Sequence, residues 1–355
     1  MHINNNTTYY KKRFWASILL AQIVLFYLLS KLKFAIDFFE IVFDYQKKIH
    51  QYIFAWIPFS FGDILYILLG GLMLYYCSKL FKKSTRSIAL KKILIIANIS
   101  YFLYQIFWGM LYFQTPLLSK LPKVENTLEL RKSLALEYLE KAKATRKQVQ
   151  EDENGIFIIK DINPLKTEIL NQQKKLPSFL THKESENINS FKPSIFNNIM
   201  SFTGILGYYN PFTAEAQYNA TLPSSYLPFT IAHESAHQIG FAREQEANFI
   251  AYLSGVNSTN KDLKYSTEYF TLKSLLNSIV LEDEKFVKNV LEQYSLEMKK
   301  DRLNEKKFIS EHQGLLNDFF GITNNLFLKS NQQEGSITYS YFIELLVRYK
   351  NIPKK

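Results

Sequence analysis

The first third of the chain alternates long apolar stretches with short clusters of Lys and Arg. Three stretches are nearly free of charged residues and long enough to cross a bilayer as helices, at about residues 14–32, 60–79 and 93–113. The third ends in Trp108, Tyr112 and Phe113, aromatic residues of the kind that gather where a membrane meets water. No small-residue cleavage site follows the first stretch, which favours an uncleaved anchor over a signal peptide. The pattern predicts a membrane domain over residues 1–115.

The basic clusters predict the orientation of this membrane domain. Three basic residues precede the first span, and six follow the second span with no acidic residue among them: Lys79, Lys82, Lys83, Arg86, Lys91 and Lys92. Because short loops rich in Lys and Arg stay in the cytoplasm, we expect a cytoplasmic N-terminus. An odd number of spans then places the rest of the chain outside the cytoplasm, which in a bacterium means an inner-membrane protein with a periplasmic domain.

Apolar residues between the first two spans recur at helical spacing. They are Phe34, Phe38, Ile41, Val42 and Tyr45. This spacing predicts an amphipathic helix that lies on the outer surface of the membrane.

Residues 116–355 show the shorter periodicities of a water-soluble domain. Apolar residues recur at helical spacing in five segments, at 125–150, 163–175, 267–281, 284–300 and 339–349. Between residues 199 and 219, apolar and polar residues alternate among turn-forming residues, which predicts short strands. We expect a mainly α (α+β) extracytoplasmic domain with a small mixed sheet.

The charge of the chain changes this picture little. The net charge is +11, but residues 1–92 contain 13 Lys and Arg against 4 Asp and Glu, which leaves only +2 for the remainder. The basic residues therefore flank the membrane spans, and we expect membrane lipid and no nucleic acid as a partner. The single cysteine, Cys77, excludes an internal disulfide and a thiolate metal site.

The candidate chemistry lies in the motif H-E-x-x-H, formed by His233, Glu234 and His237. Two histidines four residues apart on a helix project from one face and can hold one Zn²⁺, while the Glu contacts a water on the open coordination position. Pro228 suits the first turn of this helix and Gly240 suits its end. We expect one zinc ion per chain and Glu234 as the general base.

Two glutamates compete for the place of third zinc ligand. Glu244 and Glu246 are two residues apart, about 200° on a helix, so they cannot both face the metal. Glu244 shares its face with small residues that allow close approach of another helix, whereas the face of Glu246 is more apolar. We expect Glu244 to be the ligand, with Glu246 as the alternative. Asn248, four residues after Glu244, can orient a ligating histidine.

The combination of H-E-x-x-H with the later E-x-x-A-N, Glu244 to Asn248, resembles the gluzincin-type zinc metallopeptidases. The longer run from Asn210-Pro211 to Asn248 is similar to a membrane-anchored family catalogued only as a domain of unknown function. That similarity continues through Phe327-Leu328-Lys329-Ser330 to Leu345-Leu346. The resemblance implies a zincin-like fold, Glu244 as third ligand and Asn248 as its support. It also implies an edge strand within 199–219 that pairs with an extended peptide, although a lid or a structural hairpin fits this segment equally well.

The sequence thus predicts a membrane-anchored zinc metalloendopeptidase that hydrolyses extracytoplasmic proteins or peptides. Two other classes remain open. One is a catalytically silent, metal-stabilised membrane sensor or scaffold, and the other is an envelope assembly factor. The intact Glu234 argues against a silent site, because a structural metal needs no base beside it. The sequence assigns no residue to oxyanion stabilisation and predicts neither the substrate nor the oligomeric state.

Overall fold

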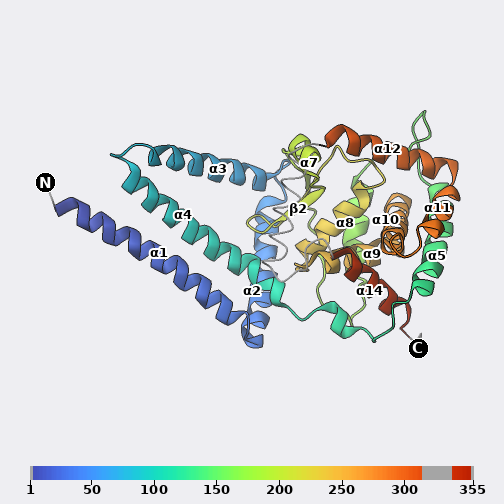
Figure 1. Cartoon of the computed structure of the whole chain (residues 1–355), viewed down its shortest axis with the longest axis horizontal. Helices are drawn as coiled ribbons and strands as arrows, with labels where there is room; N and C mark the ends of the chain where they lie inside the picture. The colour runs from blue at the N-terminus through green and yellow to red at the C-terminus, as the bar shows by residue number, and fades with distance from the viewer. Residues whose placement is uncertain (1–2, 314–337, 353–355) are drawn as a thin grey trace.

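The computed structural model describes residues 3–313 and 338–352, so the segment Phe327 to Ser330 lies outside the described residues. In the described part, three helices are long and apolar enough to cross a membrane. These spans are Lys12–Leu29 in α1 (Ile3–Leu29), α3 (Phe61–Leu80) and α4 (Arg86–Phe107). The structure therefore confirms the three apolar helices near the N-terminus. The N-terminus and the turn between α3 and α4 lie at the end of these helices farthest from the remaining domain (Figure 1).

The end of the third predicted span is wrong. Helix α4 ends at Phe107, and the next residues form the short 3₁₀-helix η1 (Gly109–Phe113). Trp108 and Tyr112 are only 7% and 3% exposed, so they are not an aromatic belt in contact with lipid. They are buried because they pack in one apolar cluster with Phe43, which comes earlier in the chain, and Tyr209, which comes later. The first span also ends three residues earlier than predicted, since α1 ends at Leu29.

The predicted amphipathic helix is present as α2 (Lys33–Phe54). It runs across the domain-facing ends of the three long helices and packs against α4 and η1 (Figure 1). Its buried face includes Phe39, Phe43 and Gln51. Gln51 donates to Ser190 and Lys192 donates to the Phe54 carbonyl, so α2 is held against the domain by polar contacts as well.

The domain is mainly helical, as expected. The helix η2 (Leu117–Lys120) leads into α5 (Leu128–Arg146), α6 (Asn163–Gln173), α7 (Asn197–Thr203), α8 (Leu227–Gln238), α9 (Glu244–Val256), α10 (Lys261–Ile279), α11 (Glu284–Glu292), α12 (Leu296–His312) and α14 (Thr338–Lys350). One apolar core joins α5, α8, α9, α10 and α14. The predicted helix 284–300 is two helices, because the Ser295 hydroxyl accepts from the Met298 amide and caps the start of α12.

The sheet is small and mixed, as predicted, with strand order β1-β3-β2. Strand β1 (Phe191–Pro193) pairs in parallel with β3 (Glu215–Tyr218), and β2 (Gly207–Asn210) pairs antiparallel with β3. Strands β2 and β3 lie inside the segment predicted to form strands, but its beginning is helix α7. Strand β2 lies at an edge of this sheet, and β3 follows it in the chain before the helix of the H-E-x-x-H motif.

Buried acidic residues join the sheet to the first turn of α3. The Glu215 carboxylate accepts from the amides of Phe61 at 3.1 Å and Gly62 at 2.7 Å, and it pairs with Lys192 at 2.7 Å. Asp63 accepts from the Ile195 amide at 2.7 Å. A helix N-terminus favours nearby negative charge, so Glu215 suits this place. The three long apolar helices and the domain are thus joined by buried contacts that cross the predicted boundary at residue 115.

Candidate metal centre

Helix α8 holds both motif histidines on one face, inside the protein. Pro228 lies in its first turn, as predicted, and every residue from Leu227 to Gln238 is buried. Gly240 has φ +98°, a conformation that favours glycine, and it turns the chain from α8 towards α9. The ring centroids of His233 and His237 are 4.7 Å apart. One helix face therefore presents two imidazoles to the same point.

Glu244, the first residue of α9, completes the group. Its Oε2 lies 3.1 Å from Nε2 of His233, and its Oε1 lies 3.6 Å from Nε2 of His237. Ligand atoms arranged tetrahedrally at about 2.0–2.1 Å from a zinc ion are about 3.3 Å from one another. Each of the two Nε2 atoms therefore lies at about this separation from one carboxylate oxygen of Glu244.

Glu246, the alternative ligand, is used elsewhere. Its Oε1 accepts from the Leu117 amide at 2.8 Å and pairs with Arg243 at 3.2 Å. It is buried and anchors the start of η2 to α9. The geometry therefore brings Glu244, and not Glu246, to the two histidines.

The second ring nitrogen of each histidine also has a partner. Nδ1 of His233 lies 2.8 Å from Oδ1 of Asn248, the contact that the sequence spacing predicts. Nδ1 of His237 lies 2.6 Å from the carbonyl oxygen of Phe241. When Nδ1–H of each ring donates to its oxygen, the neutral form of that imidazole carries its lone pair on Nε2, on the side of Glu244. Such support is typical of histidines that bind a metal.

Glu234 lies beside the histidines without pairing with them. Its carboxylate and the two imidazoles offer ligand atoms within 4.8 Å of one another. Its Oε2 is buried and has no hydrogen-bond partner among the described residues. Burial raises the pKa of Glu234 to about 7, with Glu244 adding to this effect and the histidines opposing it. A buried carboxylate with a free oxygen and this pKa is suited to accept a proton near neutral pH.

The charges of His237 and Glu244 stabilise each other when no metal is bound. Burial opposes charge on both groups, but the Glu244 carboxylate raises the pKa of His237 to about 9. The two histidines in turn hold the pKa of Glu244 well below its usual range. His237 and Glu244 are therefore held together as an ion pair, and a metal that binds Nε2 of His237 would release its proton.

Sequence reasoning missed the aromatic wall of the site. The Trp108 ring meets His237 edge to face, with centroids 5.6 Å apart, and it packs against Tyr209 at 4.8 Å and Phe43 at 6.0 Å. Gly207 of β2 is equally close to the site, because a Cβ there would lie 2.6 Å from Cγ of Glu234. The only sequence signal for this wall was the aromatic cluster after the third span, which the hydropathy pattern assigned to the membrane interface.

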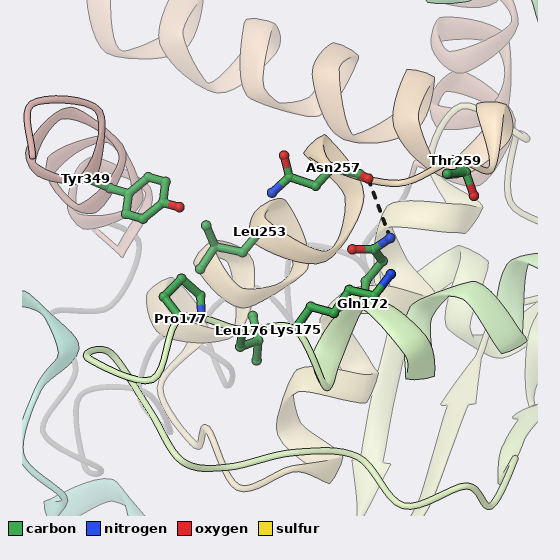
Figure 2. Close-up of a pocket in the computed structure, with 8 residues that line it drawn as sticks. All are labelled: Gln172, Lys175, Leu176, Pro177, Leu253, Asn257, Thr259 and Tyr349. Atoms are coloured by element: carbon green, nitrogen blue, oxygen red, sulfur yellow. Dashed lines mark hydrogen bonds between the residues drawn. The ribbon is translucent and has the colours of Figure 1, made fainter. Parts of the chain in front are cut away.

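A separate pocket lies at the other end of α9, between α6 and α14 (Figure 2). It has a volume of about 310 Å³, and none of its lining residues is a histidine, a cysteine or an acid. Gln172 reaches across it to the carbonyl of Asn257 at 3.5 Å. Since Leu253 of this pocket is nine residues after Glu244, about 14 Å along the helix, the pocket is not part of the candidate metal centre.

Comparisons with known proteins place the chain in a family without assigning an activity. No curated protein and no solved structure matches it. One family model matches residues 38–347, most of the chain, from α2 to α14. The chain therefore belongs to the family described as Protein of unknown function (DUF3810).

Proposed function

We propose that this protein is a membrane-anchored zinc metallopeptidase that hydrolyses peptide bonds of extracytoplasmic proteins or peptides. The observation that carries the proposal is the set of His233, His237 and Glu244, whose facing atoms are 3.1 and 3.6 Å apart, with Glu234 unpaired beside them. The orientation in the membrane rests on the Lys and Arg clusters at the end of the long helices that is farthest from the domain.

The residues of the chain have separate roles in this mechanism. His233, His237 and Glu244 would hold the zinc ion, which would polarise a substrate carbonyl and acidify a water molecule. Glu234 accepts a proton from the attacking water and delivers it to the leaving amine. Asn248 and the Phe241 carbonyl hold the imidazoles in place. Strand β2, beside Glu234, is an edge to which an extended substrate can add by main-chain hydrogen bonds.

The proposed activity is tested with the full-length protein in detergent and a mixed-sequence peptide library, half of it free and half acylated. Products are read by mass spectrometry for the wild type, Glu234→Gln and Glu268→Gln. Glu268 is the matched control, because it is a buried carboxyl that accepts from Thr145 at 2.7 Å in another part of the domain. We expect Glu234→Gln to lose cleavage by about 10²–10⁴-fold, the usual contribution of a general base.

Cleavage, and not zinc content, separates this function from a silent metal-stabilised scaffold. Both functions predict that Glu234→Gln still binds zinc, since Glu234 is not one of the three proposed ligands. Only the peptidase function predicts cleavage by the wild type and its loss in the variant. Cleavage by Glu234→Gln at the wild-type rate, or none by zinc-loaded wild type, would contradict the proposal.

A further inference from the structure

The candidate metal centre lies next to the end of an apolar helix, and this position bears on its substrates. Trp108, which is in contact with His237, directly follows the last residue of the apolar helix α4. The ring of Phe43 in α2 touches Trp108. A Cβ on Gly240 would lie 2.9 Å from this Phe43 ring. The wall of the site therefore contains Trp108, next to the end of the apolar helix α4, and Phe43 of the amphipathic helix α2.

Helix α2 shows where the bilayer surface runs. Its side facing away from the domain carries six apolar side chains at helical spacing, between 56% and 80% exposed, which we call the outer stripe: Phe34, Phe38, Ile41, Tyr45, Ile49 and Tyr52. The helix begins four residues after the end of α1 and ends seven residues before the start of α3. Since both ends are held at membrane helices, the outer stripe is covered by the same bilayer that those helices cross.

The candidate substrate strand is also held at this level. Tyr208 of β2 donates to Asp63 in the first turn of α3 and packs against Tyr66, one turn further into that helix, with ring centroids 6.3 Å apart. Phe212, just after β2, packs against Phe107 at 6.3 Å and Tyr66 at 6.5 Å. A peptide added to the edge of β2 would therefore lie over the ends of α3 and α4, next to the bilayer.

These contacts set the distance between the bilayer and the chemistry. The path from the outer stripe to His237 first crosses helix α2, which is about 10 Å wide. It then follows the ring contacts of Phe43 with Trp108 and of Trp108 with His237, so its total length is on the order of 20 Å. An extended chain rises about 3.3 Å per residue, so roughly six residues cover this distance. In a substrate that is anchored in the bilayer, the segment that reaches the site most directly is therefore the one that connects the anchor to the rest of the substrate.

We propose that the substrates are polypeptides anchored in the same bilayer, cleaved in the extended segment within about ten residues of the anchor. This inference rests on the proposed peptidase function and names its substrate class. Soluble extracytoplasmic proteins are the alternative substrates, and the test separates the two.

The test uses the full-length protein in lipid nanodiscs and one mixed-sequence peptide library in three forms. In the first form, the library follows a membrane-inserted acyl chain directly. In the second, a rigid spacer of 20 prolines holds it about 60 Å from the same acyl chain. In the third, it is free in solution. Mass spectrometry reads the rate and position of each cleavage, and Glu234→Gln provides the background.

We expect the directly anchored library to be cleaved at least tenfold faster than the spaced one, with cut sites within about ten residues of the acyl chain. The spaced library is the matched control, because it is equally concentrated at the membrane and differs only in its distance. Equal rates for both anchored forms, or faster cleavage of the free library, would overturn the membrane-adjacent substrate class and leave the peptidase function intact. No cleavage of any form by zinc-loaded protein would overturn the peptidase function, and this inference with it.

Discussion

Each of the two motif histidines is held in its orientation by a single contact at Nδ1. His233 and His237 each use Nδ1 for one contact, to Asn248 and to the Phe241 carbonyl, and each turns Nε2 towards Glu244. The Phe241 carbonyl belongs to the backbone and cannot be removed by substitution. Asn248 is a side chain, so the support of His233 can be tested by itself.

Replacing Asn248 by Ala should weaken zinc binding without abolishing it. The His233 ring would lose the contact that fixes its orientation, and loss of such a contact usually costs about 10–100-fold in metal affinity. Competition with a fluorescent chelator measures this change. Asn257→Ala, at the other end of α9, is the matched control and should retain the wild-type affinity. Equal affinities for the two variants would show that Asn248 does not support a metal ligand.

The sequence predicted which candidate residues lie together better than it predicted what surrounds them. The i,i+4 spacing of His233 and His237 and the later Glu244 could be interpreted from helix geometry alone, because each element is local. The aromatic wall could not, since Phe43, Trp108 and Tyr209 come from three distant segments and carry no motif. Hydropathy cannot distinguish a ring that faces lipid from one buried against a domain, so Trp108 was placed at the wrong surface.

At the scale of elements, the contact between α3 and the sheet is the main connection of the two parts. Glu215 is fully buried, pairs with the buried Lys192 and caps the first amides of α3. Its place is unusual for a charged residue, because burial is tolerated only where the charge is paired and hydrogen-bonded. The sequence does not predict that β3 and its Glu215 hold α3, because the amides of Phe61 and Gly62 lie more than 150 residues earlier in the chain.

Glu215→Gln should destabilise the protein strongly. The amide leaves Lys192 buried without a counter-charge, which costs about 3–5 kcal/mol in comparable pairs. Equilibrium denaturation in detergent gives the change in the free energy of unfolding. Glu284→Gln removes one partner of an exposed ion pair with Lys288, 65% exposed on both sides, and should cost less than about 1 kcal/mol. Similar losses for both variants would mean that the contact with α3 contributes little to stability.

At the scale of the whole molecule, membrane helices and domain form one unit. The number of apolar helices, the amphipathic α2 and the mixed sheet follow from periodicity, which is a local property of the chain. Their mutual placement does not, because it depends on contacts such as those of Asp63 with Ile195 and of Gln46 with the Pro211 carbonyl. Because Trp108 and Phe43 of the N-terminal part form a wall of the candidate metal centre, the experiments use the full chain and not residues 116–355 alone.

The most direct measurement is the zinc content of the full-length protein, determined by elemental analysis after dialysis at a fixed concentration of free zinc. The account predicts one zinc ion per chain in the wild type and in Glu246→Gln, and less than a tenth of that in His237→Ala and Glu244→Gln. Glu246 is the matched control, because it is a buried carboxylate two residues away that contacts Leu117 and Arg243. A folded wild-type protein without zinc, or zinc loss in Glu246→Gln and not in Glu244→Gln, would contradict the account.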